Sequence, residues 1–325
     1  MDGTFVRSQV IDPRVLRALC QRSDFRGAVQ AGSHFGAILT TGTLLWLTWG
    51  TWWSVPLFIV HGVLINFLYA GQHELSHGTP FKTKPVNEWL GRLIGFLMLY
   101  PRDFDQIQHT AHHKWTQDWA RDGELARQPY SLRTYLLWLL GPTYWWSRIT
   151  RLIRLSRGIV LEPYIRPDQG ALVIREARIH IGLYAAIALV SVALQSWAAV
   201  ILWLAPMILT KVFHQLQNTI EHLGLSHEDN ILENTRSTRT NALMRWMCWN
   251  MQYHTAHHAF PSVPFHQLRD LNAKMSEGAG RGPHAMGYLE FQIEVIRQLW
   301  GGKTEADYPY DQIWVTSRGE RVLLD

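Results

Sequence analysis

The sequence predicts an all-α integral membrane protein with four transmembrane helices in two hairpins and a cytoplasmic helical cap. Residues 27–73 and residues 179–210 contain no Asp, Glu, Lys or Arg. Windows of that length without charge are not typical of a soluble surface. Tryptophan is also abundant, with 16 residues in a chain of 325, and it gathers at the ends of both windows, as in the aromatic belts of membrane helices.

The first charge-free window is long enough for two crossings and a tight turn, because a helix needs about 20 residues to span a bilayer. We expect one helix over residues 35–53, a turn at Pro56 and a returning helix over residues 57–72. Residues 1–34 precede this hairpin as a cytoplasmic N-terminal segment, with a short helix over residues 13–20.

The second window predicts two tight crossings, over residues 180–195 and 197–210, and the latter helix is expected to continue to residue 222 or close to it. Between the windows, residues 87–100 are apolar but too short to span, so they predict an interfacial or re-entrant helix. Residues 132–146 predict a second interfacial helix, and the arginines that follow are expected to contact anionic lipid.

This pattern divides the chain into the N-terminal segment, a membrane domain at residues 35–270 and a cytoplasmic C-terminal tail or cap at residues 271–325. The mostly soluble part of the chain begins at residue 223. A soluble protein with two buried helical hairpins is the alternative, but the tryptophan-rich helix ends favour the membrane interpretation.

The distribution of positive charge predicts the orientation. The two inter-helix turns carry no Lys or Arg, whereas the segments before, between and after the hairpins carry many. Because such charge stays on the cytoplasmic side, we expect a multi-pass protein with both termini in the cytoplasm. The net charge of +5 then belongs to that face and does not indicate a nucleic-acid partner, since basic and aromatic residues are not interleaved on a soluble module.

The first 26 residues lack the apolar stretch of a signal peptide, so none is expected. The two cysteines, Cys20 and Cys248, form neither a Cys-x-x-Cys motif nor a disulfide framework.

Three histidine clusters indicate a metal site. The pentapeptide His-Thr-Ala-His-His occurs at 109–113 and again at 254–258, and His-Glu-Leu-Ser-His occupies 73–77. Histidines three or four residues apart share one helix face, and the predicted orientation puts all three clusters on the cytoplasmic side. One histidine alone is more often a surface or core residue, but chance does not explain a repeated pattern. The eight candidate ligands are His73, His77, His109, His112, His113, His254, His257 and His258.

Eight imidazoles exceed the four ligands of a single zinc ion, so they predict a dinuclear site. Imidazole without thiolate suits iron, zinc, copper or nickel.

A fourth segment points to the same place. His214, Asn218 and His222 recur at every fourth position and share one helix face. His222 is a ninth candidate ligand, with an ordinary helix-surface histidine as the alternative. Metal-bound histidines usually donate their other N–H to a carboxylate or carbonyl. The expected supporting residues are Asn218, Asp122, Glu221 and His214, and further acidic candidates are Glu74, Asp105, Asp118 and Glu124.

The three clusters resemble the histidine boxes of the membrane fatty acid desaturase and hydroxylase superfamily. The segment Asn218-Thr-Ile-Glu-His222 is similar to an additional Asn-x-x-x-His element of some members, and the run Phe260–His266 is similar to the pattern after the last box. Box order, hairpins and spacing agree over residues 35–270, which we expect to be a desaturase-like membrane domain. The first box has three residues between its histidines, where acyl-CoA desaturases typically have four.

The resemblance implies a non-haem diiron centre, held by the eight box histidines and His222, with O2 as oxidant. It implies an integral membrane oxidoreductase that desaturates a fatty acyl or lipid chain, or else a hydroxylase or another oxidase of a hydrophobic substrate on the same scaffold. A membrane zinc hydrolase or a metal carrier is the alternative from a different class. A hydrolase needs only three or four protein ligands, however, and a carrier places ionisable ligands within its spans.

An external electron donor is also implied. The sequence has no Cys-rich iron–sulfur motif and no His-Pro-Gly-Gly haem segment, so the donor is expected to be a ferredoxin, a rubredoxin or cytochrome b5. The sequence leaves open the substrate, the position attacked, the acyl carrier and the choice between desaturation and hydroxylation.

Overall fold

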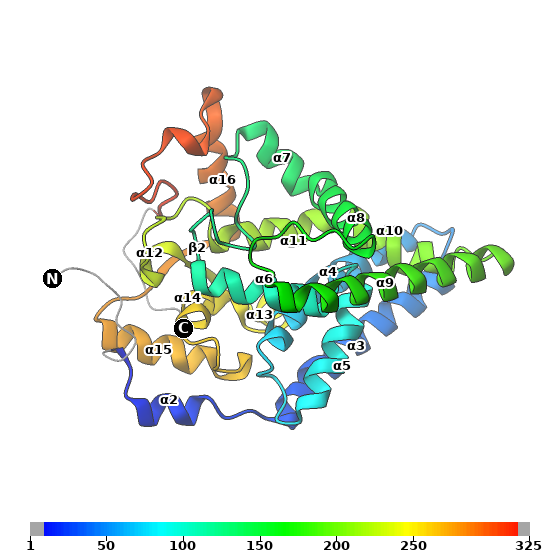
Figure 1. Cartoon of the computed structure of the whole chain (residues 1–325), viewed down its shortest axis with the longest axis horizontal. Helices are drawn as coiled ribbons and strands as arrows, with labels where there is room; N and C mark the ends of the chain where they lie inside the picture. Colours follow the sequence, from blue (N-terminus) through cyan, green and yellow to red (C-terminus); the bar gives the residue numbers. More distant parts are fainter. Residues whose placement is uncertain (1–9, 318–325) are drawn as a thin grey trace.

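Helices dominate the structure, a computed structural model in which residues 10–317 are described (Figure 1). The exception to the all-α prediction is a small parallel sheet of two strands, β1 (Arg236–Arg239) and β2 (His284–Gly287). Its register pairs Arg236 with His284 and Arg239 with Gly287. Strands of four residues are too short to give a clear alternation of polar and apolar positions, so the sequence did not indicate them.

The first charge-free window forms a packed pair of helices. α2 (Pro13–Leu19) confirms the predicted short helix, and α3 (Asp24–Leu47) packs along α4 (Ser54–Ser76). α3 begins well before residue 35, because the Ser23 side chain accepts a hydrogen bond from the Arg26 backbone N–H and caps the helix there. The absence of charge marks the apolar part of a helix but not its start.

The second window forms one long helix and one broken helix. α9 (Pro167–Ala193) is continuous. The predicted single helix from residue 197 to 222 is wrong, because the chain bends by 40° at Thr210. Pro206 lacks a backbone N–H, and the Thr210 hydroxyl donates to the Pro206 carbonyl at 2.8 Å while it accepts from Asn66 at 3.1 Å. The pieces are η1 (Val200–Leu204, π-helical), α10 (Ala205–Leu209), α11 (Lys211–Asn218) and η2 (Thr219–Glu221, 3-10).

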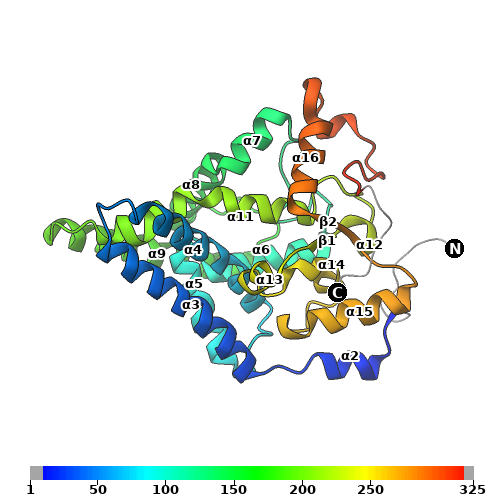
Figure 2. The same ribbon diagram turned by 180° about the vertical axis from the view of Figure 1, so that it is seen from behind.

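Two helices, α4 and α9, are long and apolar enough to cross a membrane, and a third crossing results if the bent pair counts as one span. α3 and α9 extend towards the end of the molecule opposite α15 and α16 (Figures 1 and 2). The turns after α3 and after α9 expose Trp52 at 90% and Trp197 at 70%. Large exposed aromatic side chains at helix ends are typical of a membrane interface, so the chain is a membrane protein.

Four helices separate the apolar segments in sequence. The predicted helix at 132–146 is two helices, because Gly141 has φ of 93° and Pro142 starts the next one. The second of them also differs from expectation: Arg148 is buried and Trp146 is 74% exposed. The prediction of an arginine face against lipid is therefore wrong for Arg148. The helices are α5 (Lys84–Leu97), α6 (Arg102–Trp115), α7 (Leu132–Leu140) and α8 (Pro142–Ser156).

The C-terminal part consists of short elements that surround the end of α4. Arg236 is almost fully buried, and its guanidinium donates to the carbonyls of Ile220, Leu223 and Val315. These bonds hold the turn after η2 against the small sheet. The elements are α12 (Ile231–Asn234), α13 (Ala242–Met247), η3 (Met251–Tyr253), α14 (His254–Ala259), η4 (Phe265–Gln267), α15 (Leu268–Ala279), α16 (Tyr288–Leu299), η5 (Trp300–Gly302) and η6 (Glu305–Asp307).

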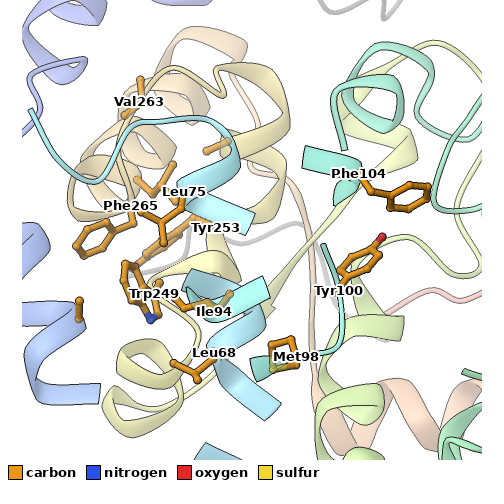
Figure 3. Packing of buried hydrophobic residues seen from close by; sticks show 14 of the residues in the cluster. Leu68, Leu75, Ile94, Met98, Tyr100, Phe104, Trp249, Tyr253, Val263 and Phe265 are labelled. Carbon is orange, nitrogen blue, oxygen red and sulfur yellow. The ribbon is translucent and has the colours of Figure 1, made fainter. Parts of the chain in front are cut away.

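One apolar core joins the membrane helices to this C-terminal part. Figure 3 shows Leu68 and Leu75 of α4 and Ile94 of α5 packed near Trp249 and Phe265. The close approach of Trp249 depends on Gly71, where an added Cβ would lie 2.9 Å from the indole ring. The last turn of α4 is thus embedded in a shared core, which fixes the position of the histidines that it carries.

The contact between α4 and α10 gives a test of the fold. A Cβ at Gly62 would clash with the Pro206 carbonyl oxygen and lie 2.6 Å from Thr210 Oγ1. We expect Gly62→Ala to destabilise the protein by about 1–3 kcal/mol through overpacking and to lower the apparent Tm in detergent. Gly36→Ala is the matched control, because no atom from another element in the described part of the chain lies within 4 Å of its added Cβ. Equal Tm values for the two variants would contradict this packing.

Candidate metal centre

Three helices and one turn bring nine histidine side chains together. α4 carries His73 and is followed directly by His77, α6 and α14 carry three histidines each, and His222 follows η2. The nine fall into two groups, within each of which the candidate ligand atoms lie within 4.8 Å of one another. The first group, of five, is His73, His77, His109, His113 and His257, and the second, of four, is His112, His222, His254 and His258.

The two copies of His-Thr-Ala-His-His divide between the groups in opposite ways. In α6, the pair separated by four residues joins the group of five, and His112 joins the group of four. In α14, the corresponding pair joins the group of four, and His257 joins the group of five. The groups are adjacent, since the rings of His113 and His258 stack with centroids 4.1 Å apart. α6 and α14 therefore each supply side chains to both groups.

Carboxylates and a carbonyl face the other ring nitrogens of several of these histidines. His112 Nδ1 donates to Asp122 at 3.0 Å, and His109 Nδ1 donates to Glu124 at 2.8 Å. His222 Nδ1 lies 3.2 Å from the carbonyl oxygen of Asn234 and donates to it. An imidazole that donates through Nδ1 carries its lone pair on Nε2, so these partners fix the tautomer that a metal ion requires.

In the group of four, the lone pairs converge. His222 Nε2 lies 3.1 Å from His112 Nε2 and 2.8 Å from His254 Nε2. When both rings are neutral, His112 and His222 donate through Nδ1, so neither then has a hydrogen on the facing nitrogen. Two facing lone pairs at this distance repel, and a cation between them removes the repulsion. His258 Nε2 in the same group is buried and has no hydrogen-bond partner among the described residues.

The group of five repeats this arrangement. His109 Nε2 lies 2.8 Å from His77 Nε2 and 2.9 Å from His113 Nε2. Nε2 of His73 lies 2.8 Å from Nε2 of His257. An all-imidazole set of this kind fits a first-row transition metal and does not resemble the oxygen-rich sites of Mg²⁺ or Ca²⁺. The donor set of each group therefore fits one metal ion.

Burial keeps most of these side chains neutral. Burial, followed by the neighbouring imidazoles, holds the pKa of His109, His113 and His254 well below the ordinary value. Neutral imidazole is the form that binds metal. His112 differs, because burial lowers its pKa but Asp122 more than offsets this and raises the pKa to about 9. A metal ion bound by His112 Nε2 would take the place of the second proton.

The other residues predicted at the site lie around the two groups. Glu221 Oε1 is 3.8 Å from His254 Nδ1 and accepts a hydrogen bond from Asn218, so Asn218 reaches a histidine of the site through Glu221. His214 belongs to neither group and bonds Lys211 Nζ at 3.0 Å. Among the further acidic candidates, Glu74 lies 3.4 Å from His257 Nδ1. Asp105 and Asp118 bond Ser76 and Arg121 instead.

A cavity of about 550 Å³ opens beside the histidines. His73, His112, His222 and His254 line one part of it. Another part is lined by side chains that the sequence reasoning did not assign to the site, namely Tyr69, Tyr100, Tyr144 and Arg148. A signal for Arg148 exists in the sequence, since Tyr144, Arg148, Leu152 and Leu155 follow helical spacing and form the buried face of α8.

Comparison with known proteins gives the class. The fatty acid desaturase family matches residues 39–290, and the chain belongs to this family of enzymes. An sn-1 acyl-lipid omega-3 desaturase (ferredoxin) from Synechocystis sp. is 25% identical over 67% of this chain and 66% of its own length. An sn-1 oleoyl-lipid 12-desaturase from Arthrospira platensis is 22% identical over 67% of both chains. A fatty acid desaturase from Bacillus subtilis is 23% identical over 66% of both chains.

The contact between Asp122 and His112 gives a test of the site. We expect Asp122→Asn to weaken metal binding about 10–100-fold, the usual effect of removing a carboxylate that orients a metal-bound histidine. The measurement is the metal retained by the purified protein after dialysis against increasing chelator. Asp118→Asn is the matched control, because Asp118 lies in the same loop and pairs with Arg121. Metal retention that is unchanged in Asp122→Asn would contradict this role.

Proposed function

We propose that this protein is an O2-dependent, non-haem diiron oxidoreductase that desaturates a fatty acyl or lipid chain in the membrane. One observation carries the proposal: nine imidazoles, seven of them buried and two half-buried, form two adjacent groups of five and four, with ring nitrogens facing one another at 2.8–3.1 Å. Membership of the fatty acid desaturase family supports it. A zinc hydrolase needs no more than four protein ligands, and so leaves at least five of these nine histidines unexplained.

The proposed ligands are the nine histidines, with one iron ion in each group. Two iron ions and O2 would supply the oxidising power that an unactivated C–H bond requires. The chain itself holds the imidazoles in the metal-binding tautomer, through Asp122, Glu124 and the Asn234 carbonyl. The adjoining cavity accommodates the substrate next to His73 and His254. Glu221 and Asn218 support His254 from outside the group.

The proposed topology has four spans in two hairpins. α3 with α4 forms the first, and α9 with the broken helix that starts at η1 forms the second. Exposed tryptophans at the turn of each hairpin support this arrangement. The absence of Lys and Arg from these turns supports a cytoplasmic position for the termini and the metal centre. Residues 1–34, 35–270 and 271–325 remain the proposed regions, although α15 runs through position 270.

The electron donor is proposed to be a separate protein, a ferredoxin, a rubredoxin or cytochrome b5. The Synechocystis relative carries ferredoxin in its name, which supports the first of these. Hydroxylation on the same scaffold is the second candidate, because small differences in the position of the C–H bond separate the two outcomes. The names of the relatives favour desaturation.

Metal content tests the centre. Protein purified without chelator is expected to contain two iron ions per chain by elemental analysis. His112→Ala should lose iron from the group of four, because it removes one of four ligands, and the iron content should fall below two per chain. One zinc ion per chain, with no iron, would contradict the proposal.

Lipid composition tests the activity. Cells that express the protein are expected to accumulate unsaturated acyl chains, and cells that express His257→Ala are not. His284→Ala is the matched control, because His284 lies on β2 and pairs with Glu233. The readout is the fatty acid profile by mass spectrometry, in which a hydroxylated chain would indicate the second candidate. Identical profiles in all strains would overturn the acyl-chain proposal.

A further inference from the structure

Two buried cations lie beside the cavity. Arg148, on α8, lines the cavity and is 8% exposed, and Lys211, at the start of α11, is fully buried. The ring of Tyr144 connects them: the Arg148 guanidinium carbon is 4.5 Å and the Lys211 ammonium 3.9 Å from its centroid. Lys211 donates to His214 Nδ1 and not to a carboxylate. Burying a charge without a directly bonded counter-charge is unfavourable, so an anionic partner for Arg148 is favourable, and Lys211 adds positive charge only when it is protonated.

The same wall of the cavity holds donors that are not used. Arg148 Nη1, the Tyr144 hydroxyl and Trp138 Nε1 are buried and have no hydrogen-bond partner within the part of the chain that the structure describes. All three side chains line the cavity. Three unpaired donors close to two cations match a group with several oxygen acceptors and a negative charge.

The carboxylates that face this region have other partners. Asp105 accepts from Ser76 Oγ at 2.9 Å. Glu124, which also lines the cavity, accepts from His109 Nδ1 at 2.8 Å. Glu305 lines the outer part of the cavity and pairs with Arg127. None of these three carboxylates forms a hydrogen bond or an ion pair with Arg148 or Lys211 among the described residues, and the charges of Asp105 and Glu124 act on Arg148 only at longer range.

We propose that the cavity wall formed by Arg148 and Tyr144, with Lys211 packed against the Tyr144 ring, is a binding site for the anionic group of the substrate, a carboxylate or a phosphate. A planar guanidinium binds either of them in a bidentate manner, and the Tyr144 hydroxyl adds a third donor. Such a site selects an amphipathic substrate whose charged end enters the protein.

The position of this site has a consequence for the reaction, which rests on the proposed function. Arg148 covers the ring of Tyr100 at 3.0 Å, the rings of Tyr100 and Tyr69 are 6.4 Å apart, and Tyr69 is 6.3 Å from the ring of His73. Two aromatic rings therefore separate the anion site from the metal centre. The anion site therefore fixes the distance between the charged group of the substrate and the carbon that is attacked. This distance does not change when the acyl chain becomes longer at its methyl end.

Equilibrium binding to the purified, detergent-solubilised protein tests the anion site. The radiolabelled probes are palmitic acid, hexadecyl phosphate and hexadecanol, which share one chain and differ in the head. We expect at least one anion to bind about tenfold or more tightly than the alcohol, as charged hydrogen bonds would provide. The anion that binds more tightly identifies a carboxylate or a phosphate as the natural head. Equal binding of all three probes would overturn the proposal.

Variants assign the preference to this wall. Arg148→Gln is expected to remove the preference for the anion and leave the affinity for hexadecanol unchanged. Arg157→Gln is the control, because Arg157 is exposed at the end of the same helix, and it should keep the preference. A preference that survives in Arg148→Gln would overturn the proposal. If Arg148→Gln fails to bind hexadecanol, Tyr144→Phe replaces it as the test variant. Tyr144→Phe must weaken binding of the anion and leave binding of hexadecanol unchanged, or the proposal is overturned.

Product analysis separates this inference from the proposed function. Palmitic and stearic acids should give a double bond at the same position counted from the carboxyl end. A double bond at a constant distance from the methyl end would overturn the inference that the charged end sets the position of attack. A lipid profile that does not depend on His257 would contradict desaturation and leave the anion preference standing. Loss of that preference with a normal lipid profile would contradict the anion site alone.

Discussion

The arrangement of the protein depends on holding nine imidazole lone pairs together inside a buried volume. Such a set is repulsive without a cation, so the surrounding structure must hold the rings together while burial keeps most of them neutral. It does so by bringing together the end of α4, the helices α6 and α14 and the turn after η2. Asp122, Glu124 and the Asn234 carbonyl fix the ring orientation of three of the nine, and the core around Trp249 anchors α4.

Much of this arrangement could be predicted from the sequence, because it depends on the spacing of histidines and of charged residues. Histidines three and four residues apart identified the faces of α6 and α14, and the charge-free windows identified α4 and α9. The sequence could not show how the histidines divide, since that depends on the angle between helices. It also missed the bend at Thr210, where the Asn66 side chain of another helix donates a hydrogen bond to the Thr210 hydroxyl oxygen. That bend and the turn after η2 are what bring His222 to the site.

α8 shows a different limit of sequence reasoning. Its arginines suggested a helix on anionic lipid, yet Arg148 belongs to the buried stripe and Trp146 faces outward. The composition of this segment shows how many arginines it contains but not which face of α8 each of them occupies. The buried cation gains a role only when the cavity is known, because its unpaired donor lies on the wall that leads to the metal centre. If both proposals hold, the same cavity joins the oxidation chemistry at one end to the recognition of a charged group at the other.

Anomalous diffraction from crystals of the purified protein, recorded on both sides of the iron absorption edge, tests the central claim most directly. Two iron peaks are expected in one chain, the first among His73, His77, His109, His113 and His257 and the second among His112, His222, His254 and His258. A single peak shared by both groups, or a signal that appears only at the zinc edge, would contradict the account.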